Sequence, residues 1–266
     1  MVWRVLPTRR RSSVLPGAEA WSAPGDGGAG VLLVHGYPGS PASLRPLAET
    51  LAEHGLAVEL PRLPGHGTTW RDLAATRWPD WARAVEEADA RLAARTRGHT
   101  VLGLSNGGAL ALHLVASKTR RGEPPPAGLI LVNPSVKVFH PLVGALPMLR
   151  RVLPVWPASG INDVAKPGVD ERAYRWWPLE TSASVLDLYE TVRAELGDVT
   201  VPTLVFTSRQ DHAVAPVNSR IVLDGIASTE TEQVWLERSY HVATLDYDAP
   251  RIAEGVLAFT ARVAGG

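Results

Sequence analysis

Short apolar runs alternate with stretches of helical spacing along most of this 266-residue chain. This alternation is typical of an α/β fold in which helices join the strands of a mostly parallel sheet. We predict strands at 31–34, 56–60, 100–104, 129–132, 202–207 and 232–236, and helices at 43–54, 79–97, 106–117, 184–196, 216–227 and 250–263. Capping chemistry predicts two of the helix ends, with Ser43 as an N-cap and Gly98 ending the helix that precedes it.

One connection in this pattern is too long for a simple crossover. About 70 residues separate the strand 129–132 from the next predicted strand, whereas most connections are far shorter. The gap holds an aromatic and proline-rich stretch before a regular helical pattern resumes at Ser184. We therefore predict one domain, with a small inserted cap at 137–181 on a core formed by 1–136 and 182–266.

Composition and charge narrow the possible functions. The chain has 45% hydrophobic and 20% charged residues, a net charge of zero and no cysteine. A packed core is expected, and balanced charge without a basic run argues against nucleic acid as a partner. The absence of cysteine excludes disulfides, a thiolate nucleophile and thiolate metal ligands.

The N-terminal arginines, Arg9 to Arg11, could open a twin-arginine leader, but no continuous apolar stretch follows them. No segment reaches the roughly 18 apolar residues of a membrane span. We expect a cytoplasmic protein without an integral membrane segment, and the sequence does not indicate its oligomeric state.

A candidate nucleophile stands at Ser105, in the G-x-S-x-G pattern of 103–107. The pattern lies between a predicted strand and a predicted helix, where a sharp turn would expose the serine hydroxyl. An ordinary glycine-rich turn is the alternative, and the strand, the helix and the additional Gly108 favour the nucleophile. A serine hydroxyl needs a base near neutral pH and a group that orients the base.

The expected base is His241, because it follows the last predicted strand, and the expected acid is Asp211, because it follows the strand before it. The order Ser105, Asp211, His241 is that of an α/β-hydrolase fold. His212 is a weaker candidate for the base, and Glu237 for the acid. The two acidic residues after His241 are expected to cap the final helix instead, and they are Asp246 and Asp248.

Two backbone N–H groups should stabilise the oxyanion of a tetrahedral intermediate. We nominate Tyr37, because Pro38 has no N–H to give, and Asn106, because it follows the nucleophile at the start of a helix. His66, in a glycine-flanked loop, is more consistent with a structural histidine than with a ligand. The scattered histidines and the lack of nucleotide-binding motifs predict neither a metal nor a cofactor.

Several segments together resemble the bacterial carboxylesterases and monoacylglycerol lipases of the α/β-hydrolase superfamily. They are VLPGAE at 14–19, LLVHGYPGSP at 32–41, LPGHG at 63–67, GLSNGG at 103–108, VNPS at 132–135 and SYHVATLD at 239–246. The resemblance spans about Val14 to Val263. It implies the same triad and oxyanion residues, a small cap over the pocket, and hydrolysis of short- to medium-chain esters or monoacylglycerols.

Two positions depart from the family pattern. Tyr37 stands where phenylalanine is common and Asn106 where an apolar residue is common, so the acyl end of the pocket is expected to be more polar. Cap residues either line an acyl tunnel or pack the cap onto the core. The candidates are Phe139, Leu142, Leu146, Met148, Trp156, Trp176 and Trp177.

The leading hypothesis from the sequence is a serine hydrolase that acts on a small, apolar carboxylic ester through an acyl-enzyme. The same triad could serve an acyltransferase, a thioesterase or a C–C hydrolase, since fold and triad do not select the acceptor. A scaffold that binds a ligand without turnover is the alternative of another class, and the intact set of serine, acid and histidine argues against it.

Overall fold

The computed structural model describes residues 12–26, 28–159 and 161–265. Seven strands form one sheet in the order β1-β3-β2-β4-β5-β8-β9, and β1 alone runs antiparallel to its neighbour. The strands are β1 (Trp21–Ala23), β2 (Ala29–Val34), β3 (Ala57–Leu60), β4 (Gly98–Leu104), β5 (Gly128–Val132), β8 (Thr203–Ser208) and β9 (Thr231–Leu236). The predicted mostly parallel sheet is thereby confirmed.

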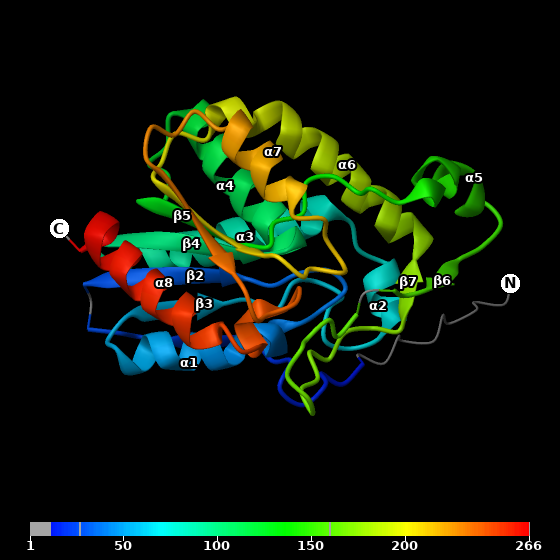
Figure 1. Ribbon diagram of the computed structural model, residues 1–266, viewed down its shortest axis with the longest axis horizontal. Coiled ribbons are helices and arrows are strands. Elements are labelled where there is room, and N and C mark those ends of the chain that lie inside the picture. Colours follow the sequence, from blue (N-terminus) through cyan, green and yellow to red (C-terminus); the bar gives the residue numbers. More distant parts are fainter. Residues whose placement is uncertain (1–11, 27, 160, 266) are drawn as a thin grey trace, which may run out of the picture.

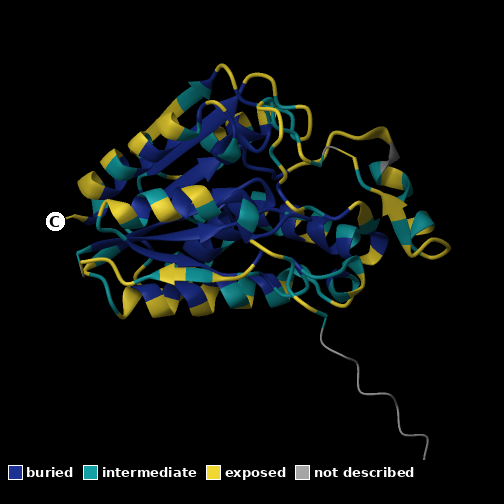
Figure 2. Cartoon of the chain, turned by 90° about the horizontal axis from the view of Figure 1, so that it is seen from below, coloured by how far each residue is buried: buried dark blue, intermediate teal, exposed yellow. Residues whose placement is uncertain are grey.

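Helices cover both faces of this sheet (Figure 1). On one face lie α1 (Arg45–Glu53) and α8 (Ala249–Ala264), whose apolar residues share a core with Phe206 of β8. The other face is covered by α3 (Trp78–Ala93), α4 (Asn106–Arg121), α6 (Leu179–Glu195) and α7 (Val217–Gly225), around Trp81. Figure 2 shows the sheet buried between these layers, with the exposed residues on the outer faces of the helices. Burial on both faces explains the continuous apolar runs of the central strands.

The segment that was predicted as a cap contains short elements of its own. They are a 3₁₀ turn at Pro141–Ala145, α5 (Leu146–Leu149), β6 (Val155–Pro157) and β7 (Trp176–Pro178). Strands β6 and β7 pair as an antiparallel ribbon at one end of the molecule, to the right in Figure 1. We refer to residues 137–181 as the cap segment. The boundary at 181 falls inside α6, which continues directly from β7.

Two predicted helix ends are wrong. Ser43 is the last residue of a 3₁₀ turn, Pro41–Ser43, and Ser40 caps that turn through its hydroxyl oxygen, which accepts the Ala42 N–H at 3.3 Å. Helix α3 ends at Ala93, and Gly98 is instead the first residue of β4. A glycine packs closely there against α8, since a Cβ atom would lie 3.0 Å from the Ala264 carbonyl oxygen.

The capping role predicted for the acidic residues before α8 is also wrong. Asp248 occupies the N-cap position, but its side chain makes no capping bond and accepts the Arg238 N–H at 2.9 Å. The Asp246 carboxylate accepts four backbone N–H groups, those of Ala165, Lys166, Tyr240 and Tyr247. Both oxygen atoms of the carboxylate are occupied by these charge-assisted bonds, so the side chain joins two loops instead of capping the helix.

The described residues begin after Arg11. The arginine cluster Arg9 to Arg11 lies outside them. Within the described part, none of the helices has the length and apolar character needed to cross a membrane.

The burial of the core predicts that alanine substitution destabilises the protein much more at Phe206 than at Phe139. Phe206 is 1% exposed, and Gly255 of α8 packs so closely that a Cβ there would lie 2.7 Å from its ring. Phe206→Ala should therefore lower the free energy of unfolding by about 3–5 kcal/mol. Phe139 is 52% exposed, and Phe139→Ala should change it by about 0.5 kcal/mol or less. Chemical denaturation of both variants measures the difference, and equal losses would contradict this placement of the core.

Candidate active site

Ser105 occupies a sharp turn between β4 and α4. Its backbone has φ 57° and ψ −122°, a conformation that a non-glycine residue adopts only under constraint. The constraint comes from neighbouring strand ends: the Ser105 N–H donates to the Val132 carbonyl at 3.0 Å, and the Ser105 carbonyl accepts the Ser135 N–H at 3.1 Å. The turn therefore holds the hydroxyl in one place.

The glycines around Ser105 are required by close packing. A Cβ at Gly107 would lie 2.1 Å from the Val34 carbonyl oxygen, and one at Gly103 would lie 2.3 Å from the Gly107 carbonyl oxygen. Helix α4 can approach β2 and β4 only because these side chains are absent. The motif glycines thus have a structural cause in this chain.

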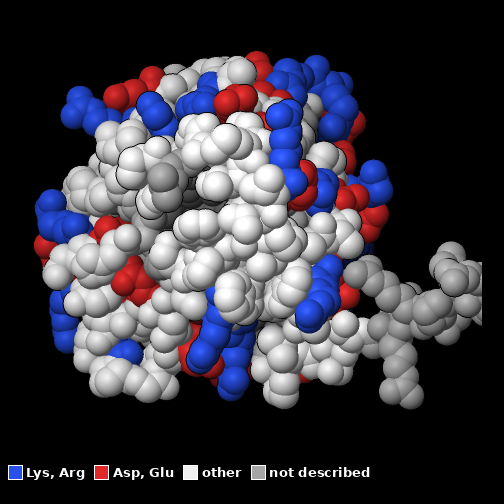
Figure 3. Space-filling view, turned by 90° about the vertical axis from the view of Figure 1, so that its right-hand side faces the viewer, with Lys and Arg blue, Asp and Glu red and all other residues white. Residues whose placement is uncertain are grey.

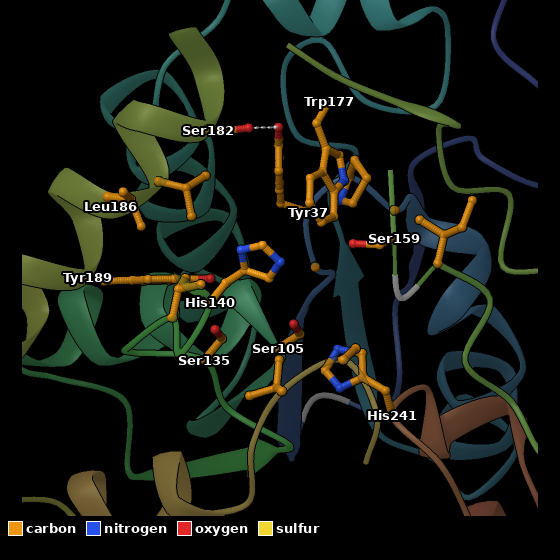
Figure 4. Close-up of a pocket in the computed structure, with 18 of the residues that line it drawn as sticks. Tyr37, Ser105, Ser135, His140, Ser159, Trp177, Ser182, Leu186, Tyr189 and His241 are labelled. Carbon is orange, nitrogen blue, oxygen red and sulfur yellow. Dashed lines mark hydrogen bonds between the residues drawn. The ribbon is translucent and has the colours of Figure 1, made fainter. Parts of the chain in front are cut away.

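Ser105 lies at a cavity of about 410 Å³ between the sheet and the cap segment. In Figure 4, His241 lies beside Ser105 on one side, Ser135 lies on the other, and Tyr37 and Trp177 lie further into the cavity. The face that carries the cap segment is hollowed, and its centre is largely uncharged, with lysine, arginine and acidic residues gathered toward its edges (Figure 3). The site is therefore a mostly apolar pocket with a serine in its wall.

The structure brings the predicted acid and base together. The His241 Nδ1–H donates to the Asp211 Oδ2 at 2.7 Å, and the two side chains are 10% and 2% exposed. Because a carboxylate only accepts hydrogen bonds, this contact places the proton on Nδ1 and leaves Nε2 as the acceptor. Asp211 does not line the cavity but lies behind the imidazole, and its Oδ1 accepts the Ala213 and Val214 N–H groups.

Asn133 connects the loops of the acid and the base. Its Nδ2 donates to the His241 carbonyl at 2.7 Å and to the Ser208 hydroxyl at 2.9 Å, while its Oδ1 accepts the Ser208 N–H at 2.7 Å. The residue is 3% exposed and has a φ of 46°. In the sequence Asn133 has no distinguishing signal, because an asparagine before a proline is also typical of an ordinary turn.

The environment of His241 changes its proton affinity in two opposite ways. Burial lowers the pKa of the imidazole, but the charge and hydrogen bond of Asp211 outweigh this effect, with further contributions from Glu171 and Asp163, so the pKa lies above its ordinary value. All the named electrostatic partners are carboxylates. The protonated form of the imidazole is therefore more stable in this site than it is in water.

One nominated N–H group belongs to a residue of the cavity wall, and the other belongs to the residue directly after Ser105. Tyr37 lines the cavity, and Asn106 is the first residue of α4, where backbone N–H groups have no acceptor within the helix. Among the described residues, neither N–H has a hydrogen-bond acceptor. Both can therefore donate to a bound group.

The two departures from the family pattern have different outcomes. The Tyr37 hydroxyl reaches Ser182 of α6 at 3.0 Å, so it adds a polar group to the cavity wall. Asn106 is 1% exposed and is absent from the wall, and its side-chain amide has no partner among the described residues. The expected polar character therefore comes from Tyr37 and not from Asn106.

A buried carboxyl group that the sequence analysis missed also lines the cavity. Glu171, in the cap segment, is 8% exposed, and its side chain accepts the Asn162 N–H. Burial raises the pKa of Glu171 above its ordinary value, although the Asn162 hydrogen bond opposes the shift. In the sequence Glu171 stands between Asp170 and Arg172, a charged run that is typical of an exposed surface.

The cap residues predicted to contact a substrate are divided by the structure. Leu146, Trp156 and Trp177 line the cavity. Phe139 does not: its ring lies under the Lys137 ammonium group and is largely exposed. The side chain of Leu142 lies outside the described residues. Met148 and Trp176 are 66% and 44% exposed and do not line the cavity.

The weaker candidates from the sequence have other contacts. His212 lies at the cavity, but its Nδ1–H donates to the Asp163 Oδ1 at 2.9 Å and its side chain is 59% exposed. Glu237 pairs with Arg209 on the surface. The ring of His66 packs against other rings, those of His35, Tyr37 and Trp81. In the described part of the chain, acidic and histidine side chains form no cluster of three that could hold a metal ion.

Fold and pocket together define an α/β-hydrolase. A family model described as serine aminopeptidase, S33, matches residues 28–248, and the chain belongs to this family. It is accordingly a hydrolytic enzyme.

Similar proteins agree with this assignment. The chain is 42% identical to the thermostable monoacylglycerol lipase of Bacillus sp. (strain H-257), over 95% of this chain and 98% of that protein. It is 25% identical to a carboxylesterase of Bacillus subtilis (strain 168), over 86% and 91% of the two chains. A solved structure reported for LipS and LipT, two metagenome-derived lipolytic enzymes, has a TM-score of 0.87 and 38% identity, with coverage of 94% and 100%.

The His241 environment predicts a measurable titration. By NMR, the pKa of the His241 imidazole should lie above that of an ordinary histidine, and Asp211→Asn should lower it because the largest favourable interaction is lost. Glu237→Gln, at an exposed carboxylate paired with Arg209, is the matched control and should leave the pKa unchanged. An unaltered titration in Asp211→Asn would contradict the assigned contact.

Proposed function

We propose that Ser105 is the nucleophile, His241 the general base and acid, and Asp211 the orienting acid of a carboxylic ester hydrolase. The observation that carries this proposal is the 2.7 Å bond from His241 to Asp211, with the imidazole beside a serine on a strained strand-to-helix turn. A serine, a buried imidazole and a carboxylate in this arrangement supply what acyl transfer requires. The protein hydrolyses carboxylic esters.

The first half of the reaction forms the acyl-enzyme. The Ser105 Oγ attacks the carbonyl carbon of the ester while its proton passes to the His241 Nε2. The former carbonyl oxygen becomes an oxyanion, which accepts hydrogen bonds from the Tyr37 and Asn106 N–H groups. The bond to the alcohol oxygen then breaks, and that oxygen takes the proton from the imidazolium.

The second half returns the enzyme to its starting state. A water molecule attacks the acyl carbon and gives its proton to the His241 Nε2, and the Ser105 Oγ leaves with that proton as the carboxylic acid is released. Asp211 stays ionised and stabilises the imidazolium at both stages. Because only the neutral imidazole accepts a proton, activity declines toward acidic pH. The raised pKa of His241 moves this decline to a higher pH than an ordinary histidine would give.

The position of His241 divides the cavity into an alcohol side and an acyl side. The imidazole must reach the leaving oxygen, so the alcohol lies toward His241 and the acyl chain lies toward α6. Apolar residues of the cap segment and α6 line the remaining wall: Val138, Val143, Leu146, Leu149, Val185 and Leu186. Such a wall suits an unbranched acyl chain.

Glu171 supports a polyol as the alcohol. Its electrostatic interaction with His241 places it near the base, and its carboxyl group is the one acidic side chain among the described residues that line the cavity. A buried carboxyl group accepts hydrogen bonds from hydroxyl groups, which a simple alkyl alcohol lacks. Together with the similarity to a monoacylglycerol lipase, this favours monoacylglycerols as substrates.

The partners and location in this proposal remain those expected from the sequence. The substrate is a small apolar ester, and neither nucleic acid nor a cofactor takes part. A cytoplasmic location is part of the proposal, and fractionation of producing cells tests it.

Removal of the nucleophile gives a direct test. Ser105→Ala should lower kcat on p-nitrophenyl butyrate by at least about 1000-fold, since members of a triad act as a unit. It should also abolish labelling by a fluorophosphonate. Ser159→Ala, at another serine of the cavity wall, is the matched control and should keep kcat within about threefold of the parent. Near-parental turnover by Ser105→Ala would refute the mechanism.

A pair of substrates with one acyl group tests the alcohol side. Glu171→Gln should lower kcat/KM for 1-lauroylglycerol by about tenfold, because one charge-assisted hydrogen bond to the glycerol is weakened. The same substitution should leave kcat/KM for methyl laurate within about twofold. An equal loss on both esters would show that Glu171 does not recognise the alcohol.

A further inference from the structure

A carboxylate of the cap segment contacts both loops of the proposed triad. Asp163 lies between β6 and β7, and its side chain is 11% exposed. Its Oδ2 accepts the His241 N–H at 3.1 Å and the His212 N–H at 3.0 Å. Its Oδ1 accepts the His212 Nδ1–H at 2.9 Å. We call residues 209–214 the acid loop and residues 239–242 the base loop.

The peptide groups of His241 are held from two directions. On one side, the side-chain amide of Asn133, the residue after β5, donates to the His241 carbonyl at 2.7 Å. On the other side, Asp163 accepts the His241 N–H, and the Asp163 backbone carbonyl accepts the Val242 N–H at 3.0 Å. Asn133, at the end of β5, therefore holds the His241 backbone on one side, and Asp163 of the cap segment holds it on the other.

The acid loop depends on the same carboxylate. The residue after Asp211 donates both its backbone N–H and its ring N–H to Asp163. The ring of His212 also packs edge-on against Tyr240 of the base loop, with centroids 4.5 Å apart. One oxygen atom of Asp163 thus bonds the base residue and the neighbour of the acid residue at the same time.

We infer that Asp163 is a positioning residue, which fixes the acid loop and the base loop relative to each other. The inference rests on the proposed roles of Asp211 and His241. Hydrogen bonds to a carboxylate are strong and directional, so the loss of this group frees two loops that the sheet restrains only in part. A displacement of about 1 Å in a catalytic group costs about 100-fold in rate.

Removal of the Asp163 charge has a second measurable effect, which is on the pKa of His241. The charged groups that face His241 are three carboxylates on two segments: Asp211 of the acid loop, and Glu171 and Asp163 of the cap segment. The titratable neighbour on the acid loop, His212, contacts Asp163 rather than the His241 ring. Removal of the Asp163 charge should lower the pKa of His241 and move the acidic limb of kcat/KM to lower pH.

The experiment compares three variants on p-nitrophenyl butyrate. Asp163→Ala should lower kcat by about 10- to 100-fold with KM within about twofold of the parent. Asp163→Asn should regain most of this loss, because its amide oxygen still accepts both backbone N–H groups. Asp170→Ala, at an exposed aspartate that pairs with Arg172 in the same cap segment, is the matched control and should keep the parental kcat.

Thermal unfolding and the pH profile separate positioning from folding. Asp163→Ala should stay folded at the assay temperature, and both Asp163 variants should show the shifted acidic limb. The inference is overturned if kcat is unchanged in folded Asp163→Ala, if Asp163→Asn loses as much as Asp163→Ala, or if the loss of kcat only follows the fraction of unfolded protein.

A parallel variant, His241→Gln, distinguishes this inference from the proposed function. Full activity of His241→Gln would overturn the catalytic assignment itself, and the positioning inference with it. An inactive His241→Gln beside a fully active Asp163→Ala would overturn only the positioning role.

Discussion

The site depends on the close packing of the turn at Ser105 against the ends of the neighbouring strands. Helix α4 approaches β2 so closely that no side chain fits at Gly107, and Ser105 accepts a strained backbone that its bonds to Val132 and Ser135 stabilise. The turn thus contacts the carboxyl ends of three parallel strands, β2, β4 and β5. In the proposed mechanism, the same turn places Asn106, one of the two proposed oxyanion donors, directly after the nucleophile.

Buried polar side chains hold the loops that follow the strands of the sheet. His241 and Asp211, the proposed base and acid, lie on loops that the apolar core does not restrain. Hydrogen bonds from buried amide and carboxylate groups restrain these loops instead. Asn133 reaches these loops from the end of β5, and Asp163 reaches the base loop from the cap segment. Asp246, which follows the base loop, accepts N–H groups of both the base loop and the cap segment. The cap segment is thus bonded to the loop of His241 and also forms part of the cavity wall.

The errors of the sequence analysis share one physical cause. The predictions for Gly98 and Asp246 rest on local rules for helix ends. In the structure Gly98 packs closely against α8, and Asp246 bonds a segment about 80 residues away in sequence. Phe139 was expected at the cavity because it is large and apolar, but the cap leaves it on the surface. Local chemistry limits the possible partners of a side chain, and tertiary contacts select among them.

The sequence by itself determined the six parallel strands of the sheet, the main flanking helices and the serine turn, because two-sided burial and close glycine packing leave direct patterns in the chain. The antiparallel edge strand β1 was not predicted. The sequence also supplied the order of the proposed triad, since parallel strands place their following loops at one edge. Only the tertiary structure decided that Glu171 lines the cavity and that Asp163 bonds both loops. A carboxylate in an irregular segment has no periodic pattern, and its role follows from the N–H groups that folding places beside it.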